Sequence, residues 1–406
     1  MGSDTWQEIQ GEVPAPKGFK ASGIASGLKK HGEDLALIIS DREAHCTALF
    51  TTNVVKAAPV LVSQAHLKRA QNKIRAIIAN SGGANACTGK KGMEVADATT
   101  KLTAKALGIK ANEVLVASTG VIGKLLDLER IKWGLPHVVS SLSPWGMPSA
   151  ARAIMTTDVI PKVYALKSVV NGREVVITGI AKGAGMVNPS LATMLSFIVT
   201  DASINPKMLD RAVRECVEKT FNSLTIEGDT STNDMIAVLA NGGSGQKIIS
   251  GEGAEFNHFA NGLLRVCERL AKSIAHDGEG ATKFVEIMVK QARTHEEAKQ
   301  IAKAVANSPL VKTAIYGSDP NWGRIISAAG RAGVPFDPDL VDLFINSECV
   351  MRQGAAAHFN LAKVREEFKQ RHLLISLHLH QGRQGATVWT CDLSHEYVTI
   401  NSSYTT

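Results

Sequence analysis

The 406-residue sequence predicts an α/β protein with mixed sheets and helices, for two reasons. Strand-like and helix-like segments alternate along the whole chain, without internal repeats or low-complexity stretches. Hydrophobic residues make up 44% and charged residues 20% of the chain, which is ordinary for a globular enzyme and excludes a disordered protein. A chain of this length corresponds to about two or three domains, and it buries enough surface to fold without disulfides or structural metals.

Short runs rich in valine and isoleucine predict the strands. The clearest runs are Ala36–Ser40, Ala76–Ala79, Val114–Ala117, Val175–Ile180 and Phe284–Val289. One helix is predicted by four apolar residues that share a face and precede a turn at residues 276–278: Leu263, Val266, Leu270 and Ile274. Thr294 and Glu297 predict a capping box at the start of a helix that runs toward Val305.

The net charge of +7 is unevenly distributed, because residues 1–192 carry +9 and residues 193–406 carry −2. A basic half could face nucleic acid or an anionic small molecule. No basic run is longer than a pair and aromatic residues make up only 5%, so the sequence favours small-molecule substrates and predicts no nucleic-acid partner.

Several features concern the compartment and metals. Six cysteines are scattered without a Cys-x-x-Cys pair, which indicates reduced thiols and no zinc site. The N-terminus lacks the features of a signal peptide, and no apolar run approaches the ~20 residues of a membrane helix. His378 and His380 have metal-ligand spacing, but without a carboxylate or cysteine pattern we interpret them as a solvated strand face. We therefore expect a cytoplasmic protein with no metal and no membrane partner.

The segment Ile180–Thr193 is the strongest candidate for chemistry. A glycine-rich stretch passes Pro189 and reaches Ala192-Thr193, just before the strand-like run Met194–Val199. One interpretation is a loop that enters a strand with threonine first. The other is a self-cleaving threonine, whose hydroxyl attacks the preceding carbonyl when the peptide bond is strained. The freed α-amine, with an ordinary pKa of about 7.7–8.0, could then act as the base for that hydroxyl.

Other loops offer the remaining parts of an acyl-transfer site. Thr119 and Gly120, after a predicted strand, offer a hydroxyl beside an unhindered N–H for a developing oxyanion, although an ordinary turn has the same composition. A phosphate-binding loop is not favoured, because neither a Walker A motif nor GxGxxG is present. Lys182 could hold a substrate carboxylate, and Glu279 a substrate ammonium or a proton in transfer. Taken alone, each of these two residues is more often a solvated loop charge.

Long motifs add a resemblance to a known family. The motifs are ASTGVIG, MTTD (Met155–Asp158), KGAGMVNPSLATML, GDTSTND, HDGEGATK, NSPLVKTAIYGSDPNWGR (Asn307–Arg324) and the terminal INSSYTT (Ile400–Thr406). From about Pro16 to the last residue, they resemble the ornithine acetyltransferases, the glutamate N-acetyltransferase family of arginine biosynthesis. Gly83 and Ser403 depart slightly from the family pattern, and neither falls on a position with an assigned role.

The resemblance implies a family-specific α/β fold, shared with a group of self-cleaving aminopeptidases, and no cofactor. It implies cleavage between Ala192 and Thr193 into an α chain of residues 1–192 and a β chain of residues 193–406. The two chains would stay intertwined, commonly as an α2β2 assembly. Thr193 would take an acetyl group from N2-acetylornithine, release ornithine and pass the acetyl group to glutamate by a ping-pong route.

The resemblance also assigns residues. Thr119 and Gly120 match the positions that stabilise the oxyanion. The positions that match substrate contacts are Thr156, Lys182, Thr193, Glu279, Asn401 and Thr406. Acetyl-CoA is an open second donor, because some family members accept it and no short motif here distinguishes them. The alternative function is an amide hydrolase or aminopeptidase that uses the same N-terminal threonine, and a non-catalytic binding protein is the alternative from another class.

Overall fold

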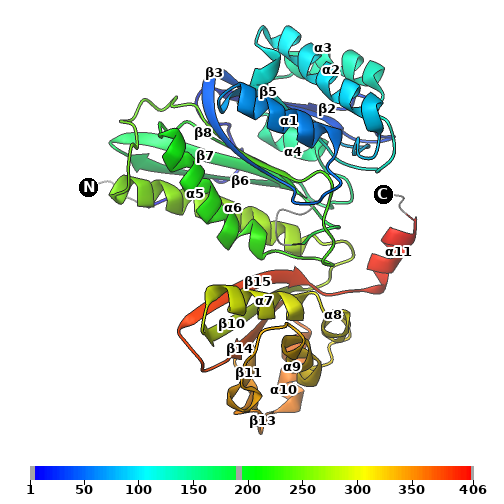
Figure 1. Cartoon of the computed structure of the whole chain (residues 1–406), viewed down its shortest axis with the longest axis vertical. Coiled ribbons are helices and arrows are strands. Elements are labelled where there is room, and N and C mark those ends of the chain that lie inside the picture. Colours follow the sequence, from blue (N-terminus) through cyan, green and yellow to red (C-terminus); the bar gives the residue numbers. More distant parts are fainter. Residues whose placement is uncertain (1–4, 189–193, 404–406) are drawn as a thin grey trace.

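The computed structural model describes residues 5–188 and 194–403, which form two bodies, each built on its own sheet (Figure 1). The prediction of an α/β protein is confirmed. The strands of the larger sheet are β1 (Gln7–Glu8), β2 (Phe19–Ile24), β3 (Leu35–Phe50), β4 (Lys73–Asn80), β5 (Val114–Ser118), β6 (Lys162–Val170), β7 (Arg173–Lys182), β8 (Leu195–Thr200) and β9 (Met235–Ala240). Its helices are α1 (Ala58–Arg69), α2 (Gly89–Leu107), α3 (Leu128–Ser140), α4 (Met147–Ala153), α5 (Pro206–Lys219) and α6 (Ala254–His276).

The larger body is a layered sandwich. Its strands follow the order β1-β6-β7-β8-β9-β3-β4-β5, with β2 paired to the free edge of β3. The 16-residue strand β3 changes register between Ile39 and Ala44, and this bulge bends the sheet so that its two halves face each other. Helices α2 and α3 cover the outside of one half, and α5 and α6 cover the other (Figure 1). The core between the halves includes α4, which contacts β2 and β3 as well as β6 and β7.

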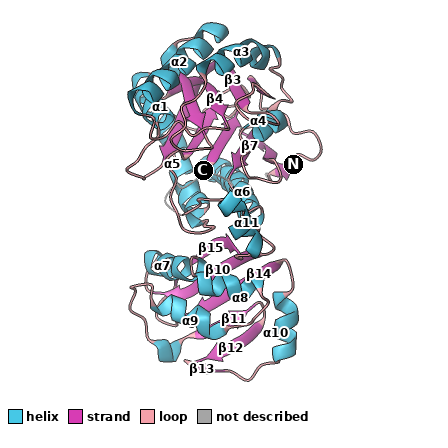
Figure 2. Ribbon diagram, turned by 90° about the vertical axis from the view of Figure 1, so that its right-hand side faces the viewer, coloured by secondary structure: helices cyan, strands magenta, loops and turns pink. Residues whose placement is uncertain are grey.

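The smaller body has the strand order β13-β12-β11-β14-β10-β15. Its strands are β10 (Phe284–Ala292), β11 (Asp342–Ile345), β12 (Glu348–Arg352), β13 (Ala355–Ala356), β14 (His372–His378) and β15 (Gln384–Cys391). The helices α7 (His295–Ala306), α8 (Pro309–Tyr316), α9 (Trp322–Gly330) and α10 (Leu361–Phe368) pack around this sheet (Figure 2). A last helix, α11 (His395–Ser403), leaves the smaller body and lies beside the larger one (Figure 1).

The predicted elements lie where the sequence placed them, with one correction. The predicted strands fall within β3, β4, β5, β7 and β10, and the helix ending at the 276–278 turn is α6. Thr294 caps α7 by accepting a hydrogen bond from Glu297 N at 3.1 Å. The Glu297 carboxylate, however, pairs with the Arg293 guanidinium, so only half of the predicted capping box is found.

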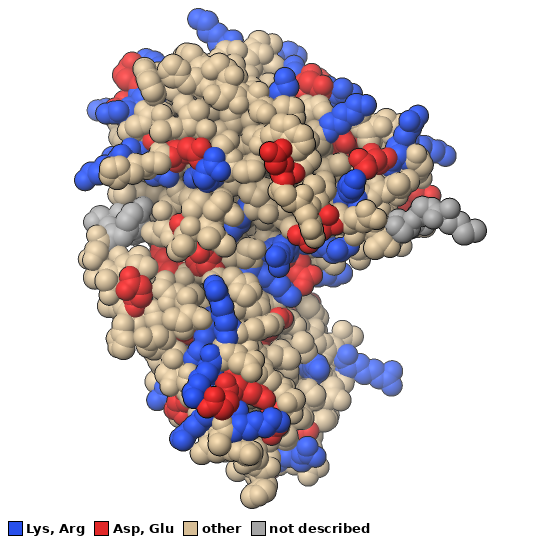
Figure 3. Space-filling view, turned by 180° about the vertical axis from the view of Figure 1, so that it is seen from behind, with Lys and Arg blue, Asp and Glu red and all other residues tan. Residues whose placement is uncertain are grey.

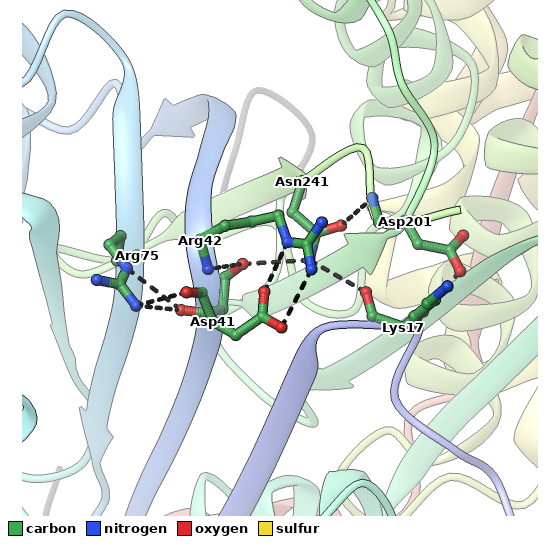
Figure 4. A network of polar contacts seen from close by, with 8 residues as sticks. Lys17, Asp41, Arg42, Arg75, Asp201 and Asn241 are labelled. Carbon is green, nitrogen blue, oxygen red and sulfur yellow. Dashed lines mark hydrogen bonds and ion pairs between the residues drawn. The ribbon is translucent and has the colours of Figure 1, made fainter. Parts of the chain in front are cut away.

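A polar network fixes the N-terminal segment on the larger sheet (Figure 4). Lys17 N donates to Asp201 Oδ2 at 3.2 Å, and Asn241 Nδ2 donates to Lys17 O at 3.1 Å. Arg75 Nη2 donates to Asp41 O at 2.9 Å, within the bulge of β3. Asp201 and Asn241 directly follow the last residues of β8 and β9. The network therefore holds the C-terminal ends of these two strands, and Thr193 precedes the opposite end of β8.

The structure also bears on the membrane, on metal binding, on the pair His378 and His380, and on the surface charge. Over residues 5–188 and 194–403, no helix is long and apolar enough to cross a membrane, and no three metal-binding side chains gather. The structure corrects the interpretation of the histidine pair in two ways. A carboxylate does lie beside it, because Asp342 Oδ2 is 3.0 Å from His380 Nε2. The two histidines do not share a strand face, because β14 ends at His378. One face of the molecule shows basic and acidic side chains interspersed (Figure 3).

Candidate active site

A cavity of about 80 Å³ gathers most of the predicted site residues. It is lined by Ala84, Thr119, Gly120, Ile122, Thr156, Thr157, Lys182, Gly185, Met186, Ser231, Thr232, Asn233, Glu279 and Asn401. Six residues assigned from the sequence are therefore brought together: Thr119, Gly120, Thr156, Lys182, Glu279 and Asn401. The other three assigned positions, Ala192, Thr193 and Thr406, lie outside the described residues.

The loop after β5 presents two hydrogen-bond donors of different kinds. Thr119 N donates to Asn80 O at 3.0 Å, so the free donor of this residue is its hydroxyl. Gly120 N has no hydrogen-bond partner within residues 5–188 and 194–403. Gly120 has φ +126, and a Cβ there would lie 2.6 Å from Gly83 N. Only glycine fits this close approach of two backbones, and a free N–H beside a hydroxyl is suited to stabilise an oxyanion.

Asn233, which was not predicted as a site residue, holds this loop in place. Its Nδ2 donates to Ser118 O at 2.9 Å and to Ala84 O at 2.6 Å. Asn233 lies just before β9, so the bonds join the two halves of the sandwich at the cavity. The motif GDTSTND contains Asn233, but the two carbonyl groups to which its Nδ2 donates are more than a hundred residues away and could not be found from local sequence.

Lys182 is the last residue of β7, is 3% exposed and lines the cavity. Burial lowers the pKa of Lys182, and the nearby carboxylates of Asp158, Asp234 and Glu279 oppose that effect. A substrate carboxylate beside Lys182 would favour its charged form further. The position and charge of Lys182 are thus suited to an anionic substrate group.

Glu279 is held by two hydrogen bonds from residues that lie far from it in the sequence. Thr157 Oγ1 donates to Glu279 Oε1 at 2.7 Å, and Asn401 Nδ2 donates to Glu279 Oε2 at 2.7 Å. Glu279 N donates to Ala184 O at 2.8 Å, which seats the loop after α6 against the glycine-rich loop. Thr156, which was predicted to contact the substrate, lines the same cavity, and its neighbour Thr157 is the residue that contacts Glu279. Asn401 brings α11 to the cavity.

Asp234 holds the chain at the first described residue after Thr193. Its Oδ1 accepts a hydrogen bond from Met194 N at 2.8 Å, and its Oδ2 is buried without a partner among the residues that the structure describes. Burial raises the pKa of Asp234 well above its usual value, against the opposing effects of the Met194 N–H and Lys182. The Asp234 side chain thus contacts the N–H of Met194, in the peptide bond that follows Thr193. No role was predicted for Asp234 from the sequence.

Glu227 holds the segment that precedes residues 189–193. Val187 N donates to Glu227 Oε1, while Glu227 Oε2 is buried without a hydrogen bond to any described residue. Burial raises the pKa of Glu227 to about 8, and the nearby Glu279 carboxylate contributes to the shift. The folded protein therefore keeps a proton on Glu227 between pH ~4.5 and ~8, where the unfolded chain loses it.

We expect Glu227→Gln to increase the free energy of unfolding at pH 8, on the order of 1–3 kcal/mol. Because the folded state binds the extra proton, wild-type stability falls as pH rises through the window from ~4.5 to ~8. Glutamine keeps the acceptor for Val187 N and removes the titration. Urea unfolding between pH 4.5 and 8 checks this, with the exposed neighbour Asp229→Asn as control. A difference between variant and wild type that does not change with pH would contradict it.

Together, the α/β fold and this cavity define the class of the protein, an enzyme with a small polar active site. The ArgJ family model matches residues 20–406, and the chain belongs to the ArgJ family. It is an acyltransferase of that family. Arginine biosynthesis bifunctional protein ArgJ of Bacillus cereus is 45% identical over 396 residues, covering 98% of this chain and 97% of the relative.

Two further comparisons support membership in the ArgJ family. The protein of the same name from Caldanaerobacter subterraneus is 46% identical over 402 residues, covering 98% of this chain and 99% of the relative. The crystal structure of the Bacillus halodurans protein of that name matches with a TM-score of 0.51 and 41% identity, and covers 52% of this chain and 100% of the solved chain.

Proposed function

We propose that this chain transfers an acetyl group from N2-acetylornithine to glutamate in arginine biosynthesis, through an acetyl ester on Thr193. One observation supports the proposal. A single cavity is lined by the Thr119–Gly120 loop, a buried lysine and a carboxylate. The lysine, Lys182, pairs with Leu195 at the start of β8, and Leu195 is two residues after Thr193. The relatives' printed name, a bifunctional protein of arginine biosynthesis, supports the pathway and leaves room for acetyl-CoA as a second donor.

Self-cleavage would produce the nucleophile. The Thr193 hydroxyl attacks the Ala192 carbonyl, the C–N bond breaks, and the hydroxyl proton passes to the departing nitrogen, which leaves an ester and a free α-amine. Water then hydrolyses the ester. A cut there divides the chain into residues 1–192 and 193–406, near-equal parts that we propose assemble as α2β2. The solved Bacillus halodurans chain, matched in full by 52% of this chain, has the length of one such part.

In the transfer, the Thr193 α-amine takes the hydroxyl proton as Oγ attacks the acetyl carbonyl. The Thr119 hydroxyl and Gly120 N–H stabilise the oxyanion, and the ornithine amine leaves with the proton. Glutamate then attacks the ester carbonyl with its neutral amine, the C–Oγ bond breaks, and the Thr193 α-amine passes the proton from the glutamate nitrogen to Oγ, which regenerates the hydroxyl. Lys182 binds the substrate α-carboxylate, and Glu279 binds the substrate ammonium.

The first test is the mass of the purified protein under denaturing conditions, followed by assays with N-acetylornithine and with acetyl-CoA as donors. Two polypeptides that break before Thr193, together with glutamate acetylation, support the proposal. An active protein that remains one 43.2 kDa chain would refute it. Release of free acetate or cleaved amides without acetylated glutamate would favour the amide-hydrolase alternative.

We expect Glu279→Gln to raise the KM for N2-acetylornithine about 10- to 100-fold and to change kcat by less than about threefold. Glutamine keeps one oxygen acceptor for Thr157 or Asn401 but removes the charge that would bind the substrate ammonium. Steady-state kinetics check this, with Glu286→Gln in β10 as control. An unchanged KM would exclude Glu279 as the ammonium contact.

A further inference from the structure

Beneath the cavity lies a group of charges that the transfer reaction does not use. Lys162 Nζ lies 2.6 Å from Asp158 Oδ1 and 2.5 Å from Asp277 Oδ2. The side chains of Lys162 and Asp158 are fully buried, and that of Asp277 is 7% exposed. Burying three charges is expensive unless they hold one another in a defined geometry.

The two carboxylates of this group also accept backbone hydrogen bonds from the segments that carry the site residues. Asp158 accepts from Thr156 N at 3.1 Å and from Gly183 N, next to Lys182, at 2.7 Å. Asp277 accepts from Val159 N at 3.0 Å. Lys162 therefore joins the MTTD turn, the end of β7 and the loop that leads to Glu279.

Asp158 is shared between two lysines. Burial opposes its ionisation, but Lys162, Lys182 and the Gly183 N–H together keep the pKa of Asp158 below its usual value. Lys162 is the direct partner, at ion-pair distance. Without Lys162, Lys182 is the cation left to neutralise the buried Asp158 carboxylate, and the Lys182 ammonium would be drawn away from the cavity.

We infer that Lys162 is a positioning residue, which pairs with Asp158 so that the Lys182 ammonium stays available to a substrate carboxylate. The inference rests on the proposed function, in which Lys182 binds that carboxylate. Lys162 was not among the residues assigned from the sequence. It opens β6, and its partners come from both sides of the proposed cleavage point, so after cleavage the group would connect the two chains.

The test measures inhibition by glutarate, a dicarboxylate without the reacting amine, as a function of pH. We expect Lys162→Met to raise the glutarate Ki at least tenfold while changing kcat much less. The charged groups that face Lys182 are Asp158, Lys162, Asp234 and Glu279, and among them Lys162 lowers the pKa of Lys182. Removing it raises that pKa, so the alkaline loss of glutarate binding should move to higher pH. If Lys162→Met only disturbed the fold, the pH at which glutarate binding is lost would not change.

A second variant separates charge from packing. Lys162→Met/Asp158→Asn removes the carboxylate that would attract Lys182, so its glutarate Ki should return to within about threefold of wild type. Lys299→Met, which removes another buried lysine paired with Glu218 away from the cavity, serves as control and should leave the Ki unchanged. If Lys162→Met does not fold, the double variant alone decides, and a rise above tenfold overturns the inference.

The outcomes distinguish this inference from the proposed function. A wild-type protein that acetylates no glutamate refutes the proposed function. A wild type that transfers acetyl groups, with an Lys162→Met variant whose glutarate Ki and pH dependence are unchanged, refutes only the positioning role. A raised Ki that the double variant does not relieve also refutes it, because charge balance would then not be the cause.

Discussion

Thr193→Ala should leave one uncut 43.2 kDa chain and reduce acetyl transfer by ~10³-fold or more. Alanine has no hydroxyl to attack the Ala192 carbonyl, so neither the cut nor the acetyl ester can form. The neighbouring strand should be unaffected, because Met194 N still donates to Asp234 Oδ1. Denaturing mass and an acetyl-transfer assay on the same sample measure both consequences.

Thr193→Ser is the matched control for this result. Serine keeps a hydroxyl and, once the chain is cut, an α-amine, so the variant should be cleaved and partly active. Complete inertness of the serine variant would count against the mechanism. A clean break before residue 193 in the alanine variant would show that cleavage does not depend on the threonine hydroxyl.

The strands and the site loops could be predicted because their determinants are local. Runs of isoleucine or valine form β4 and β5, and the glycine-rich loops beside these strands line the cavity. The contact between Thr157 and Glu279 spans 122 positions, and that between Asn233 and Ser118 spans 115. Such pairs depend on how segments that are distant in the sequence pack together in the folded protein. Local sequence carries no information about them.

The buried ionisable groups were missed for a related reason. Asp158 and Asp234 lie in motifs that the sequence analysis quoted, yet neither was given a role. A carboxylate in a polar loop motif is ordinarily exposed, and only the closed sandwich shows that both are buried. Lys162 gave no local indication at all, because a lysine at the start of a strand is usually solvated. Burial and pairing are consequences of tertiary packing.

Gly120→Ala should lower kcat about 10²- to 10³-fold, the effect of losing one oxyanion donor. The added Cβ would lie 2.6 Å from Gly83 N and 2.8 Å from Gly82 C, both backbone atoms that cannot move aside as a side chain would. The loop must shift, and the Gly120 N–H moves with it. Because the donor acts mainly on the developing charge, kcat should fall much more than KM rises.

The same loop supplies the control for backbone strain. Gly123 also has a positive φ, +81 against +126 for Gly120, but a Cβ there would meet nothing within 4 Å. Gly123→Ala therefore introduces a comparable conformational cost, about 1 kcal/mol, without displacing the loop. Both variants should lose thermal stability, Gly120→Ala more because of its backbone clash, while only Gly120→Ala loses turnover in protein whose mass shows that it is cut. Equal losses of kcat would mean that loop strain, and not the position of the Gly120 N–H, controls the reaction.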